Sequence, residues 1–204
     1  PQLLQQYPDV EFDLGGSTKE ENTLKMRTAV GFIAALFMIY GLLAVPLRSY
    51  VQPLVIMSVI PFGFIGAVVG HILFGISLNM LSILGLVALA GVVVNDSLIL
   101  VEFANRRRAD GMSIEDSLMS AGQQRFRAIV LTTLTTFVGL LPMLFETSMQ
   151  AQFVIPMAIS LSFGIVFATT MTLILVPCFY RIVYDVKDSL SVPLEFIKAK
   201  ISND

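Results

Sequence analysis

One apolar run, residues 79–104, constrains this chain more than any other feature of its sequence. At about 1.5 Å per residue, a helix of that length crosses a bilayer core of about 30 Å. Asn95, Asp96 and Ser97 nevertheless lie in the middle of the run, and three arginines follow it at positions 106–108. An ionisable side chain at that depth costs at least about 2.5 kcal/mol on insertion scales, so Asp96 is a candidate functional residue.

The rest of the chain repeats this apolar character. Hydrophobic residues make up 55% of the sequence and charged residues 14%, which is typical of membrane proteins. Five apolar runs reach or nearly reach the length of a spanning helix, and they lack the polar face of a helix in a soluble protein. The predicted spans are 28–45, 53–73, 79–104, 126–145 and 153–183, within a transmembrane domain over 28–184. The predicted fold class is therefore all-α, a polytopic transmembrane bundle.

Two polar segments flank this domain. In residues 1–27, the alternation at 10–14 before two glycines predicts a short strand that ends a soluble domain lying upstream. A helical lead-in should follow, with Ser17 and Glu20 at capping-box spacing, and a flexible linker is the alternative. We expect the chain to be a piece of a longer protein. For the tail, residues 185–204, an interfacial helix and a disordered segment both stay open.

The positive charges predict the orientation of the bundle. The loops at 74–78 and 146–152 contain no lysine or arginine. Ten of the thirteen basic residues lie on the other side, and only Lys19, Lys25 and Arg27, in the leading segment, share the side of these two loops. The positive-inside rule then places the N-terminal segment outside and the C-terminus in the cytoplasm. On the cytoplasmic side, Ser113 and Asp116 resemble a capping box, and residues 113–122 are predicted to form a short helix along the membrane surface.

A stripe of polar residues on the fourth span falls at the depth of Asp96. Arg125, Thr132 and Thr136 share one helix face, and the threonines lie roughly 10 and 16 Å inward from the arginine. Asp96 lies about 15 Å inward from Arg106. If the two helices are neighbours, carboxyl and hydroxyl groups can meet and pass protons. The alternative for the threonines is packing, with hydroxyls bonded to their own helix.

Other residues give weaker indications of a functional site. His71 is expected to be an unpaired interfacial histidine, and Gly66 and Gly70 form a small-xxx-small pair suited to helix packing. Glu102, one turn from the arginines that follow it, is expected to be either paired or hydrated. With a single cysteine and a single histidine, we expect no disulfide within the chain, no metal site and no cofactor. A nucleophile–base pair is missing as well, so an intramembrane hydrolase finds no support and the chain is not expected to be an enzyme.

Several motifs together resemble the resistance-nodulation-division (RND) efflux pumps. The run GVVVNDSLILVEFA at 91–104 resembles their tenth transmembrane helix, and RFRAIVLT at 125–132 followed by TFVGLLPM at 136–143 resembles the eleventh. PLRSY at 46–50 and IPFGFIG at 60–66 resemble the passage from the eighth helix to the ninth. The order and spacing agree over nearly the whole chain.

The resemblance implies helices eight to twelve of a proton-driven exporter of drugs or other amphiphilic compounds in the bacterial inner membrane. Residues 1–27 would then end a periplasmic α/β porter domain. The implied partners are protons, amphiphilic substrates, membrane lipids, two further copies in a homotrimer, a periplasmic adaptor protein and an outer-membrane channel, with no nucleic acid. The alternatives are an RND-related exporter of lipid or metal and a sterol-sensing-like domain that binds lipid without transport.

The resemblance also implies a proton relay that joins two aspartates on the fourth helix, outside this chain, to polar residues here. Arg125 and Thr132 fall at the relay arginine and threonine of the family. Asn95 falls where the drug pumps have a lysine, and Asp96 where they have an asparagine, so the charge balance of the relay must differ. The predicted relay set is Asp96, Asn95, Arg125 and Thr132, with Ser97 and Thr136 in support.

Overall fold

A computed structural model describes the backbone of residues 17–201 and the side chains of residues 23–187. All regular elements of that part of the chain are helices: α1 (Ser17–Leu47), α2 (Gln52–Met57), α3 (Ile60–Phe74), α4 (Met80–Ala109), α5 (Ile114–Leu144) and α6 (Met149–Ile201). The predicted strand at 10–14 lies outside the described residues, and so do the side chains of the predicted Ser17–Glu20 cap. The chain divides into two compact units, Pro1–Met38 and Ile39–Asp204, and the bundle discussed below belongs to the second.

The all-α prediction is confirmed. Five helical stretches are long and apolar enough to cross a membrane: Thr23–Leu47, Gln52–Phe74, Met80–Ala109, Ile114–Leu144 and Met149–Lys187. The second stretch consists of two helices, α2 and α3, with a short turn at Ser58 between them. Pro61, in the first turn of α3, has no N–H to donate to the carbonyl of Met57, and this missing hydrogen bond favours the break between the two helices.

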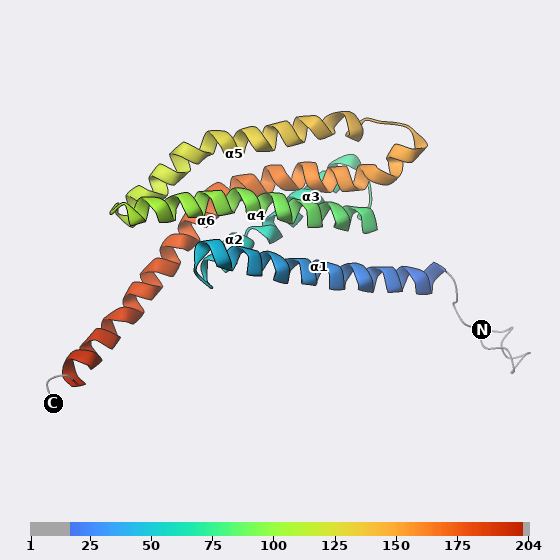
Figure 1. Cartoon of the computed structure of the whole chain (residues 1–204). Coiled ribbons are helices and arrows are strands. Elements are labelled where there is room, and N and C mark those ends of the chain that lie inside the picture. The colour runs from blue at the N-terminus through green and yellow to red at the C-terminus, as the bar shows by residue number, and fades with distance from the viewer. Residues whose placement is uncertain (1–16, 202–204) are drawn as a thin grey trace, which may run out of the picture. The chain divides into compact units, whose positions relative to one another are not determined.

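The long last helix, α6, is the packing partner that α3, α4 and α5 share. In Figure 1, α4 and α6 run in the same direction and α5 runs back the opposite way. The contact with α3 is especially close at Gly66, where an added Cβ would lie 2.5 Å from the Cβ of Phe167 and 2.6 Å from the carbonyl oxygen of Phe163. The small-residue pair on this helix therefore brings two backbones together, as its spacing indicates.

Two segments differ from the sequence-based expectation or extend it. Residues 113–122, expected as a separate surface helix, form the first turns of α5, which is continuous to Leu144. Ser113 caps it as predicted, since its Oγ accepts a hydrogen bond from the Asp116 N–H at 3.1 Å. The helix continues because Ser117 and Ala121 are buried against the bundle and no proline lies between residues 113 and 141. At the other terminus, α6 continues as a helix to Ile201.

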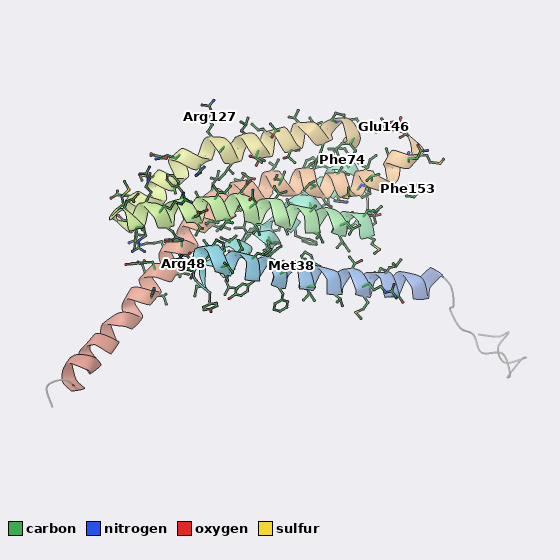
Figure 2. All side chains as sticks on the ribbon, in the orientation of Figure 1. Met38, Arg48, Phe74, Arg127, Glu146 and Phe153 are labelled. Atoms are coloured by element: carbon green, nitrogen blue, oxygen red, sulfur yellow. The ribbon has the colours of Figure 1, made fainter. Side chains whose placement is uncertain are left out.

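The two ends of the bundle differ in charge. The end that holds Arg48 and the arginines at 106–108 is called the basic end here. Phe74, Glu146 and Phe153 lie together at the opposite end in Figure 2. There, the Glu146 carboxylate accepts hydrogen bonds from the N–H groups of Ser148 and Thr147, both at 3.0 Å, and these bonds lower the pKa of Glu146.

His71 corrects one prediction. It is buried, with 3% of its surface exposed, and both ring nitrogens have partners. Nδ1 lies 2.9 Å from the Ala67 carbonyl oxygen, and Nε2 lies 2.8 Å from Ser82 Oγ on α4. Because a carbonyl only accepts, Nδ1 carries the hydrogen, and in the neutral ring Nε2 accepts from the serine. The expectation of an unpaired interfacial histidine was wrong, because its partner comes from the next helix.

Candidate functional site

The three polar residues in the middle of α4 point to different sides of the helix. Asp96 is 7% exposed and Ser97 is fully buried, whereas Asn95 lies on the exposed side. The cause is the helix period, because consecutive residues are about 100° apart around the axis. Asp96 and Ser97 thus face the bundle, and Asn95 faces away from it. Among the described residues, the Asp96 carboxyl has no hydrogen-bond or ion-pair partner.

A row of buried hydroxyl groups crosses the bundle beside Asp96. Ser97 Oγ donates to the Val93 carbonyl at 2.8 Å and lies 3.5 Å from Thr172 Oγ1 on α6. One turn away on α6, Thr169 Oγ1 lies 2.7 Å from Thr133 Oγ1 on α5. We call these four residues, Ser97, Thr133, Thr169 and Thr172, the hydroxyl seam. It joins α4, α6 and α5 through groups that can both donate and accept a hydrogen.

The predicted threonine stripe lies beside this seam and not in it. Thr132 is exposed, and its Oγ1 donates to the Ala128 carbonyl at 3.0 Å, while Thr136 is half-buried. In the part of the chain that the structure describes, no hydrogen bond joins either residue to Asp96. The neighbouring Thr133, one position on, is the α5 threonine that faces α6.

Arg125 lies nearer the basic end than Asp96 does. Its Cζ is 5.1 Å from the centre of the Phe103 ring on α4, and Arg107 Cζ is 5.0 Å from the same ring. Phe103 is seven residues beyond Asp96, which corresponds to about 10 Å along the helix. The arginine thus holds α5 to α4 through an aromatic ring. Within the described residues it makes no ion pair with Asp96. Of the two alternatives for Glu102, pairing and hydration, the structure shows pairing, with Arg106 one turn on.

The exposed face of α4 around Asn95 is open in the bundle. A Cβ added at Gly91, one turn earlier on that face, would meet no atom within 4 Å. Thr132 on α5 is open as well. The predicted relay set is thereby divided, with Asp96 and Ser97 inside the bundle and Asn95 and Thr132 on its outer surface. Among the described residues, no group of three histidine, cysteine or acidic side chains is placed to hold a metal ion.

The comparison with known families decides what kind of protein carries this site. A sequence model described as the AcrB/AcrD/AcrF family matches residues 2–184. The chain belongs to the AcrB/AcrD/AcrF family. The resemblance to RND pumps drawn from the motifs on α4 and α5 is therefore confirmed.

Solved structures support the same conclusion. Two crystal forms of a heavy-metal efflux pump are similar to this chain, at 25% and 24% sequence identity with TM-scores of 0.75 and 0.76. The similarity covers 89% and 90% of this chain but only 19% of each pump chain. The chain thus spans about a fifth of the length of the pumps it matches.

The hydroxyl seam shows what sequence reasoning missed. The predicted site does not include Thr169 or Thr172, although three threonines at 169, 170 and 172 interrupt the apolar run of the fifth predicted span. That interruption was the available signal. A mid-span group of hydroxyl residues resembles the polar group in the third span, and in this member of the AcrB/AcrD/AcrF family the two groups meet.

Proposed function

We propose that this chain is part of the transmembrane domain of a proton-driven efflux pump, and that Asp96 binds and releases the coupling proton. The observation that carries the proposal is the burial of Asp96 without a hydrogen-bond or ion-pair partner among the described residues. A carboxylate in that setting is costly, whereas its protonated form is far less so. Proton binding and release at Asp96 therefore change the free energy of the surrounding helix packing.

The energetic scale fits this role. A proton that crosses the whole membrane releases about 2.3 kcal/mol per 100 mV. That is enough to shift an equilibrium between two helix arrangements by more than tenfold, given about 1.4 kcal/mol per factor of ten. Such coupling requires a group that is charged in one arrangement and neutral in the other, and Asp96 has the chemistry for it.

The neighbouring polar residues have distinct proposed roles. Ser97 and the rest of the hydroxyl seam supply hydrogen-bond partners on the inner side of α4. Asn95 and Thr132, on the open surface, would contact the part of the pump that precedes this chain, together with Thr136. Arg125 would act from the basic end, since its stacking on Phe103 keeps the guanidinium about 10 Å from Asp96 along the helix.

The proposed substrates are drugs or other amphiphilic compounds, exported in exchange for protons entering the cell. The proposed assembly is a homotrimer in the bacterial inner membrane, with a periplasmic adaptor and an outer-membrane channel. A second candidate is export of heavy-metal ions, because the similar solved structures are those of a heavy-metal efflux pump. Transport of an amphiphilic dye and of a heavy-metal ion by the same full-length pump in vesicles distinguishes the two candidates.

The test of proton coupling uses Asp96→Asn in the full-length pump, with Asp96→Glu as the matched control. Asparagine keeps the size and hydrogen bonding of the side chain but cannot titrate. We expect the variant to reach normal membrane levels and to lose dye export driven by an imposed pH gradient, while Asp96→Glu retains part of it. Full export by Asp96→Asn would reduce Asp96 to a structural residue.

The proposed orientation places the basic end in the cytoplasm. Its test is cysteine labelling in a background without the exposed Cys178. A cysteine at Ser148 should react with a membrane-impermeant thiol reagent added to the periplasmic side, and one at Ser113 should not. The reverse pattern would contradict the orientation and the proposed direction of proton flow.

A further inference from the structure

A pocket of about 610 Å³ opens at the basic end of the bundle, far along α4 from Asp96. It is bounded by the turn after α1, by α2, and by the last turns of α4 and the part of α6 near Val183. None of the residues that line it belongs to the hydroxyl seam. The proton-coupling proposal therefore leaves this pocket without a role.

The lining of the pocket combines an apolar wall with two cations. Val55 is buried and Val183 is half-buried, while Val51 and Val186 form an exposed apolar rim. Arg108 and Lys187 lie in the same lining, and no acidic residue does among the described residues. An apolar wall beside positive charge suits a ligand that is itself part apolar and part anionic.

The two cations of the pocket have no acidic partner among the described residues, and neither does Arg107, whereas two nearby arginines do. Arg106 is paired with Glu102, and Arg181 is paired with both Glu115 and Asp185. Arg108, by contrast, stacks over the Tyr184 ring at 4.1 Å, and its buried Nε has no hydrogen-bond partner in the described part of the chain.

Lys187 is exposed and makes no ion pair within the described residues. Together with Arg108, it leaves positive charge in the pocket that an anion can compensate.

Hydrogen bonds hold the walls of the pocket in place. Gln52 on α2 and Asn105 on α4 exchange two side-chain hydrogen bonds, at 3.1 and 3.0 Å. Tyr180 on α6 donates to the same Asn105 oxygen at 2.7 Å. Three helices are thus joined through the amide of Asn105, whose partners Gln52 and Tyr180 both line the pocket. A pocket whose walls are fixed before binding loses less entropy when a ligand enters.

We propose that this pocket binds an anionic phospholipid, with the lipid phosphate between Arg108 and Lys187 and an acyl chain along the valines. Its position favours a lipid, because the mainly apolar run of α4 ends at Ala104 and three arginines occupy positions 106–108, which puts Arg108 at the level of the headgroups. Basic pockets between transmembrane helices are suited to anionic headgroups. The inference requires only that the helices span a bilayer, and it holds whether or not Asp96 couples protons.

The experiment measures binding of fluorescent phosphatidylglycerol to delipidated full-length pump in detergent. The double variant Arg108→Gln with Lys187→Gln should bind the lipid about tenfold more weakly or worse. The matched control, Arg106→Gln with Arg127→Gln, removes the same charge outside the pocket and should bind within about twofold of the wild type.

A second pair of variants tests the pocket without changing charge. Val186→Trp should fill the pocket from its rim and weaken binding. Ile182→Trp, on the same helix and equally exposed (54% against 53%), should not, because Ile182 does not line the pocket. Neither site is in the buried core, so both proteins should fold.

Competition identifies the ligand. Unlabelled phosphatidylglycerol should displace the probe, whereas phosphatidylcholine and inorganic phosphate should not at matched concentrations. Displacement by inorganic phosphate would mean an anion site without lipid recognition, and displacement by phosphatidylcholine would mean an apolar groove without charge recognition. Absence of binding by the wild type would mean that another part of the pump fills the pocket. Each of these results, or equal binding by all variants, would overturn the inference.

Discussion

The substitution Gly66→Ala tests the packing of α3 on α6. A methyl group at this position would lie 2.5 Å from Phe167 Cβ, 2.6 Å from the Phe163 carbonyl oxygen and 3.2 Å from Gly164 Cα. Carbon atoms in contact prefer separations of about 3.5–4.0 Å, so the two helices must move apart by roughly 1 Å. None of the three atoms is the far end of a flexible side chain, so a rotamer change cannot relieve the overlap.

The expected cost follows from two opposing terms. Overpacking of this kind costs about 1–3 kcal/mol, and the higher helix propensity of alanine returns up to about 1 kcal/mol. We expect Gly66→Ala to destabilise the protein by about 1–2 kcal/mol and to lower its melting temperature in detergent. The matched control is Gly139→Ala on α5, where an added Cβ meets no atom within 4 Å, so only the propensity gain applies. The two changes should have opposite signs, and a Gly66→Ala protein that melts as high as Gly139→Ala would refute the close approach of α3 and α6.

Three further predictions concern named contacts. His71→Phe removes the hydrogen bond to Ser82 and should lower the melting temperature through a loss of about 1–3 kcal/mol, whereas an unchanged melting temperature would contradict the buried pairing. Because backbone N–H groups lower the pKa of Glu146, its stabilising effect should be present above about pH 4.3 and be lost as the pH falls through the lowered pKa. Glu146→Gln should remove that pH dependence from the melting curve, and an identical pH profile in both proteins would exclude the effect. Phe103→Leu removes the ring under Arg125 and should cost about 0.5–1 kcal/mol for that stacking contact. A double-mutant cycle with Arg125→Gln measures the coupling energy between the two side chains, and a coupling energy of zero would contradict the contact.

Much of the fold could be predicted because membrane spans depend on length and apolar composition, both of which the sequence displays directly. The continuation of residues 113–122 into the fourth span could not be predicted. Gly122 and the polar residues around it suggest a break, and the burial of Ser117 and Ala121 prevents that break. In this segment tertiary packing overrides the local sequence pattern. The pairing of His71 could not be predicted either, because its partner lies beyond a turn whose path the sequence does not specify.

The candidate site, like the fold, could be predicted from the sequence only in part. The depth of Asp96 follows from counting residues along a helix, and the sequence therefore identified it. Whether a given face of a helix is buried depends on which neighbouring helix covers it. The helical period of the sequence does not identify that neighbour. For this reason the sequence pattern predicts Thr132 as the site residue on α5, although Thr133 is the residue that bonds to α6. Asn95 lies beside Asp96 in sequence but faces the opposite environment for the same geometric reason.

The most direct test of proton coupling is to detect the proton on Asp96 itself. Infrared difference spectra of the full-length pump in lipid, recorded as the pH is changed, report the carbonyl band of a protonated carboxylic acid. We predict a band that appears and disappears within the pH range in which the pump works, and that is missing from Asp96→Asn but retained, with a shift, in Asp96→Glu. A wild-type pump that transports its substrate while this band stays constant, or an Asp96→Asn spectrum identical to that of the wild type, would contradict the assignment of Asp96 as the coupling group.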